Sequence, residues 1–71
     1  MTERMSPRQI LKSRGLKHVW VARRMGISRF YLSRLLSGER TWSEELQRLF
    51  ALTVGMDETS IAFGPEQTEN E

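Results

Sequence analysis

Basic side chains are concentrated in the first half of this chain. Residues 1–38 hold nine Lys and Arg and one acid, Glu3, whereas residues 39–71 hold two Arg and eight acids, so the halves carry net charges of +8 and −6. Guanidinium and ammonium groups bind phosphate through charge-assisted hydrogen bonds. The asymmetry predicts one face that binds a polyanion and a different use for the acidic half. The alternative is that these charges serve only solubility.

Side chains that would support catalysis or metal binding are scarce. The chain has no Cys, one His, and only one acid before residue 39. We find no metal-ligand cluster, Ser-His-Asp set or glycine-rich phosphate loop in the sequence. Glu44 and Glu45 are adjacent, so they lie on different sides of a helix and are better explained by the helix dipole. We therefore predict no enzymatic activity, no metal and no cofactor.

The length and composition predict one small domain. The 71 residues are 38% hydrophobic and 28% charged, an ordinary composition for a chain that folds in water. Without Cys, the fold cannot depend on disulfides. No apolar run approaches the roughly 18–20 residues of a membrane span, and the first residues lack the apolar core of a secretory signal. We expect a cytoplasmic location.

Glycines divide the sequence into short helical segments. Gly15, Gly26, Gly38 and Gly55 each follow a stretch with helical periodicity, as expected for a glycine just beyond a helix end. Sustained period-2 alternation is missing, so we predict an all-α fold class. Its expected domain covers residues 1–63, and residues 64–71 form a disordered acidic tail because they contain no apolar residue.

The expected helices are bounded by recognisable start signals. Ser6, Pro7 and Gln9 fit a capping box at the first helix, and Ser28 fits an N-cap at the third. The fourth helix begins at Thr41 or Ser43. The set of expected helices is residues 7–14, 17 or 18 to 25, 29–37, 41 or 43 to about 54, and a last short helix that follows Asp57 as N-cap and uses Ile61 and Phe63. We expect Trp20, on the second helix, to cover a neighbouring helix.

The link between the second and third helices is very short. Only Gly26, Ile27 and Ser28 separate them, and such a link makes the helices cross as in a helix-turn-helix. Ala22 is small enough for the third helix to approach the second closely. Ile27 fills the corner of the turn.

The segment from Leu16 to Arg40 resembles the Cro/repressor (XRE-type) helix-turn-helix family. The resemblance is carried by Leu16 to Ser28, then Leu32 to Arg40, which ends in the typical Ser-Gly-Glu-Arg stretch. It implies a compact five-helix, lambda-repressor-like bundle whose third helix enters the DNA major groove. Trp42 stands where the family commonly has a proline.

The resemblance also implies which side chains read base edges. These exposed positions of the third helix and its cap are Ser28, Arg29, Phe30, Ser33 and Arg34. Arg29 or Arg34 could bind guanine O6 and N7 as a fork, and Phe30 could pack on a thymine methyl group. The alternatives are solvated charges for the two arginines and a protein interface for Phe30.

A second set of positions is expected to bind the DNA backbone. These residues are Lys17, His18, Tyr31, Ser37 and Arg40. Lys17 and His18 stand at the start of the second helix, where the family usually has Thr-Gln or Ser-Gln and holds a phosphate. His18 could instead be an ordinary surface histidine, and Tyr31 could pack beside the third helix.

The sequence therefore predicts a sequence-specific double-stranded DNA-binding regulator, a small bacterial or phage repressor. Such proteins usually bind pseudo-palindromic sites as homodimers. The candidate dimer contacts follow the third helix and are Trp42, Val54, Met56, Ile61 and Phe63. One alternative is a protein-interaction module, such as an antitoxin or a phage accessory protein. Another is a non-specific architectural DNA binder.

Overall fold

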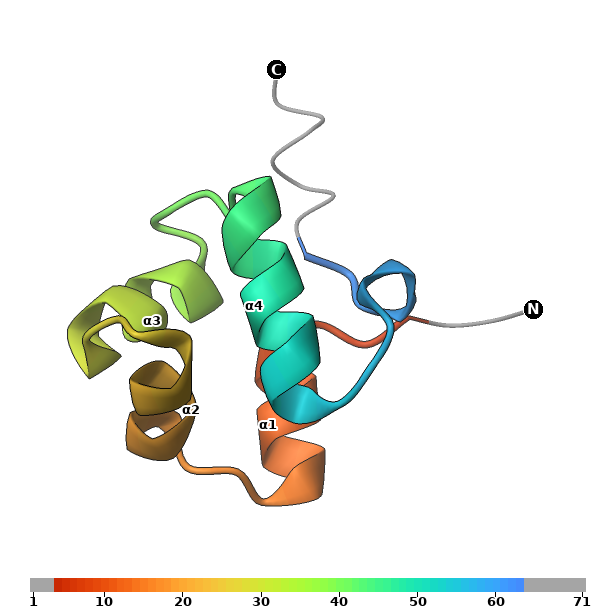
Figure 1. Cartoon of the computed structure of the whole chain (residues 1–71), viewed down its shortest axis with the longest axis horizontal. Helices are drawn as coiled ribbons and strands as arrows, with labels where there is room; N and C mark the ends of the chain where they lie inside the picture. The colour runs from red at the N-terminus through yellow and green to blue at the C-terminus, as the bar shows by residue number, and fades with distance from the viewer. Residues whose placement is uncertain (1–3, 64–71) are drawn as a thin grey trace.

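The computed structural model describes residues 4–63, and helices account for most of this range (Figure 1). The elements are α1 (Pro7–Arg14), α2 (His18–Met25), α3 (Arg29–Ser37), α4 (Glu44–Val54) and a single 3-10 turn, η1 (Glu58–Ser60). Within the described residues, the only strand-like pairing is one isolated bridge between Met5 and Ile61. The all-α prediction is confirmed. The tail predicted to be disordered, residues 64–71, lies outside the described residues.

Side-chain caps fix the starts of three helices. At α1, the Ser6 hydroxyl accepts a hydrogen bond from the Gln9 amide (3.2 Å), and the Gln9 side chain accepts one from the Ser6 amide (3.0 Å). At α4, the Ser43 hydroxyl accepts from the Leu46 amide (3.2 Å), so the helix begins after Ser43 and not at Thr41. Each bond satisfies a backbone donor that a helix start would otherwise leave unpaired.

Gly26 lets the chain turn abruptly from α2 toward α3. Its φ is +78°, in the left-handed region that glycine enters without the strain a Cβ atom causes. The Ile27 amide then donates to the Ala22 carbonyl (3.0 Å) and closes the end of α2. Only Ile27 and Ser28 remain before α3 begins, as the sequence indicates. The two helices are consequently held against each other.

The core contains an aromatic cluster of Trp42, Phe50 and Phe63. Their ring centroids lie 4.9–5.8 Å apart in tilted or edge-to-face arrangements. The indole nitrogen of Trp42 donates to the Leu35 carbonyl at 3.2 Å, so its polar end is satisfied although the side chain is buried. This bond joins the segment before α4 to the end of α3.

The prediction of dimer contacts is wrong for four of the five residues that it named. Trp42, Val54, Ile61 and Phe63 are only 2–8% exposed, and Met56 is half-buried against the same core. A side chain that the core already covers cannot also form a dimer interface without unfolding part of the domain. The sequence did not separate the two uses, because an apolar residue after α3 suits a core and an interface equally well.

The expected fifth helix is the single turn η1. The chain turns back there and becomes extended, so that Ile61 pairs with Met5 and the Ala62 amide donates to the Met5 carbonyl (2.9 Å). Asp57 makes no side-chain bond to the helix backbone, and it accepts instead from the Thr59 hydroxyl (2.9 Å). This arrangement buries Ile61, and a helix that continued past Ser60 would not pair Ile61 with Met5.

The helices α2 and α3 form one side of the molecule. α2 packs against both α3 and α4, and Figure 1 shows α2 and α3 together on one side of α4, with η1 on the other. The end of α1 is tied to the end of α4, because the Arg14 guanidinium donates to the Val54 carbonyl (2.8 Å). The packing of α2 against α3 and α4 therefore holds α2 and α3 in place, and their outer surfaces are exposed.

Candidate nucleic-acid interface

The helix α3 has one buried and one exposed side. Leu32 and Leu35 are at most 2% exposed and anchor it to the core. All five residues predicted to read bases lie among the exposed positions at or near the start and middle of this helix: Ser28, Arg29, Phe30, Ser33 and Arg34. The structure thus brings the predicted base-reading set together on a single surface.

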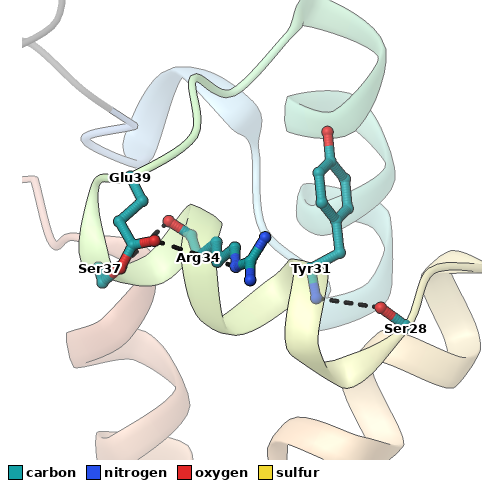
Figure 2. A network of polar contacts seen from close by, with 5 residues as sticks. All are labelled: Ser28, Tyr31, Arg34, Ser37 and Glu39. Carbon is teal, nitrogen blue, oxygen red and sulfur yellow. Dashed lines mark hydrogen bonds and ion pairs between the residues drawn. The ribbon is translucent and has the colours of Figure 1, made fainter.

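The Ser28 and Ser37 hydroxyls are engaged with the α3 backbone (Figure 2). The Ser28 hydroxyl oxygen accepts from the Tyr31 amide (3.0 Å), and the Ser37 hydroxyl donates to the Arg34 carbonyl (3.2 Å). Ser28 keeps its own hydroxyl proton for another acceptor, whereas the Ser37 proton is used within the helix. Ser28 therefore combines the cap of α3 with one free donor.

Arg34 has one weak ion pair. Its Nε lies 3.9 Å from a Glu39 carboxylate oxygen, and both side chains are more than half exposed (Figure 2). An exposed pair at this distance contributes about 0–1 kcal/mol. A phosphate or a guanine edge could therefore compete with Glu39 for the guanidinium group at little cost.

Arg29 and Phe30 are both exposed at the start of α3. Phe30 is 68% exposed, and the Arg29 guanidinium carbon lies 5.2 Å from its ring centroid. This cation–π contact restricts both side chains but leaves most of the aromatic surface in water. The ring contributes little to the folding of this domain, so it is free to contact a partner.

A shallow hollow connects the start of α2 with the start of α3. Its lining comes from two residues of α2 and three of α3, namely His18, Val19, Arg29, Phe30 and Ser33. His18 was predicted to bind the DNA backbone and the α3 residues to read bases, so the two predicted sets meet here. Val19 is 45% exposed in this hollow. The sequence does not relate Val19 to the predicted DNA-binding residues, because only the packing of α2 against α3 brings it beside Arg29 and Phe30.

The start of α2 offers backbone donors as well as side chains. Lys17 is the N-cap and forms no capping bond, as its residue type predicts. The first amides of a helix lack carbonyl partners within the helix, and together with the helix dipole they favour an anion. Lys17 and His18 are both exposed beside them. This combination suits a phosphate group.

Tyr31 and Arg40, which were also predicted to bind the DNA backbone, differ in how exposed they are. Tyr31 is half-buried and packs against the core, so its ring mainly serves folding. The Arg40 guanidinium carbon lies 6.0 Å from that ring centroid, and Arg40 is exposed. Its charge is available to a phosphate near the end of α3.

Two further exposed side chains were not assigned to the interface from the sequence. Arg8 of α1 lines a second hollow with Ser37 and Gly38, which places it beside the end of α3. Nothing in the local sequence relates residue 8 to residue 38, because only the packing of α1 brings them together. Trp20 is 42% exposed, with the Arg24 guanidinium carbon 5.2 Å from its ring centroid, so it covers its neighbours only in part.

The surface of α2 and α3 is consistently basic. The two helices contain Arg23, Arg24, Arg29 and Arg34, all exposed, and no acidic residue. Glu39, just after α3, is the first acid in this part of the chain. Such a surface attracts polyanions at long range and contacts them without like-charge repulsion.

The comparisons with known proteins give no family for this chain. No family model, curated protein or solved structure matches it. Within residues 4–63, no helix combines the length and the apolar character needed to cross a bilayer. The same residues contain no group of three or more side chains that could hold a metal ion.

Proposed function

We propose that this protein is a sequence-specific double-stranded DNA-binding regulator of the Cro/repressor helix-turn-helix type. The observation that carries the proposal is the exposed side of α3. There Arg29, Phe30, Ser33 and Arg34 project from a helix whose opposite side is anchored by buried leucines. Guanidinium and hydroxyl donors, together with an exposed aromatic ring, are groups that can distinguish one base edge from another in the major groove.

The dimensions of α3 fit the proposed task. An α-helix with its side chains is about 10–12 Å wide, which matches the roughly 12 Å width of the major groove of B-DNA. In the proposed helix-turn-helix, α3 lies in the groove and the start of α2 faces the adjacent sugar-phosphate backbone. Lys17, His18 and the free amides of α2 then bind phosphate, and Arg40 and Arg8 extend the contact at the other end of α3.

The proposed mechanism is repression by steric exclusion of RNA polymerase from a promoter. The protein would act in the cytoplasm of a bacterium or a phage-infected cell, as a homodimer on a pseudo-palindromic site. Because four of the five dimer candidates named from the sequence are buried, we place the proposed contact on the outside of α4. Leu52 is 73% exposed there, which makes it the most exposed large apolar side chain in residues 4–63.

A selection from random duplex DNA tests the proposed function. The wild type should enrich one sequence motif, and the Arg29→Ala/Arg34→Ala variant should lose it. The matched control, Arg4→Ala/Arg48→Ala, removes two other exposed arginines and the same total charge, so it should enrich the same motif with weaker binding. Failure of the wild type to enrich any sequence at low salt would refute the proposal.

The second candidate function is a protein-interaction module. The observation that favours it is the partial exposure of Val19 and Trp20, 45% and 42%, on α2. Salt separates the two candidates. DNA binding through several phosphates weakens steeply as salt concentration rises, whereas a mainly apolar protein contact does not.

A further inference from the structure

The hollow between α2 and α3 combines apolar walls with a basic rim. Val19 and Phe30 are the apolar side chains of its lining, and they are 45% and 68% exposed. His18, Arg29 and Ser33 complete the lining with polar groups. Single exposed apolar residues are ordinary on protein surfaces, but here two from different helices border the same hollow. The hollow therefore suits a small apolar group that belongs to a polar, negatively charged partner.

We propose that this hollow is a subsite for the C5-methyl group of a thymine base. The proposal rests on the proposed function, and it adds Val19 of α2 and the hollow itself to the thymine contact expected of Phe30. Among the major-groove edges of the four bases, the C5-methyl of thymine is the only apolar group. The absence of acids from α2 and α3 allows the surrounding phosphates to approach.

Each wall of the hollow has its own role. Phe30 supplies the larger apolar surface, and the Arg29 guanidinium 5.2 Å from its ring centroid restricts the ring's position. Val19 is the other apolar residue of the lining and comes from α2, which is packed against α3. Its β-branched side chain has few rotamers, so the wall is preorganised. Methyl recognition thus depends on the packing of the two helices as well as on the residues of α3.

Replacing thymine by deoxyuridine tests the subsite directly, because it removes only the methyl group and keeps every hydrogen-bonding group. Each thymine of the selected duplex is replaced in turn, and the dissociation constant is measured. Burial of one methyl group predicts about a fourfold weakening at one position of each half-site. The other thymines should show less than about a twofold change.

Variants of the hollow assign the effect to these two side chains. Phe30→Ala should bind the thymine and deoxyuridine duplexes equally at the sensitive position, and Val19→Ala should reduce the difference. Ser60→Ala, a change at an exposed residue of η1 outside the hollow, should keep the full difference. Thermal unfolding should show that all three variants are folded, since none of these side chains is buried.

The outcomes separate the subsite from the proposed function. If the wild type selects a motif and binds it equally with thymine or deoxyuridine at every position, the methyl subsite is refuted and the DNA-binding function remains. A difference that persists unchanged in Phe30→Ala also overturns the subsite. If no duplex is selected at all, both proposals fail, and a protein partner becomes the better occupant of the hollow.

Discussion

At the scale of single residues, Trp42 stabilises the core through both packing and a hydrogen bond. It is buried, contacts Phe50 and Phe63, and donates to the Leu35 carbonyl. Trp42→Phe removes that hydrogen bond and part of the buried volume, which should lower the free energy of unfolding by about 1–3 kcal/mol. Urea unfolding followed by circular dichroism measures this change. Leu52→Ala should stay within about 0.5 kcal/mol of the wild type, and equal losses in both variants would contradict this account of the core.

The sequence predicts some of these residues better than others. The capping bonds of Ser6 and Ser28 were predictable, because a cap depends on residues only three positions apart. The exposure of Phe30 followed from helical periodicity in the same way. The burial of Trp42 and Phe63 and the position of Arg8 beside Gly38 depend on contacts between distant segments. Local patterns carry no information about such contacts.

At the scale of elements, the start of α2 shows a conflict between stability and proposed binding. Lys17 occupies the N-cap and provides no capping bond. Lys17→Ser would supply one and should raise the free energy of unfolding by about 1 kcal/mol. The same change removes a charge beside the proposed phosphate contact, so DNA affinity should fall several-fold. Urea unfolding and a DNA titration on one preparation measure both effects. Ser28→Ala is the control, because it removes an existing capping bond and should therefore destabilise the fold. A rise in DNA affinity for Lys17→Ser would contradict the proposed role of Lys17.

At the scale of the whole molecule, the separation of charge should govern affinity for any duplex. Residues 64–71 contain three glutamates, so Glu66→Gln/Glu69→Gln/Glu71→Gln raises the net charge from +2 to +5. Binding to a random-sequence duplex should become several-fold tighter at low salt, because the whole molecule then repels phosphates less. The gain should largely vanish at about 0.5 M salt, where screening acts over only a few ångströms. A gain that is independent of salt would mean that these glutamates act otherwise than by charge.

An NMR titration of the ¹⁵N-labelled protein with the selected duplex shows directly which helix contacts DNA. If α3 reads DNA, the largest amide shift changes should occur at the start of α2 and along α3, especially at Arg29, Phe30 and Ser33. The amides of η1 should change least, because Figure 1 places that turn on the opposite side of α4. Shift changes centred on η1 and the outer side of α4, with α3 unaffected, would contradict the claim that α3 reads DNA.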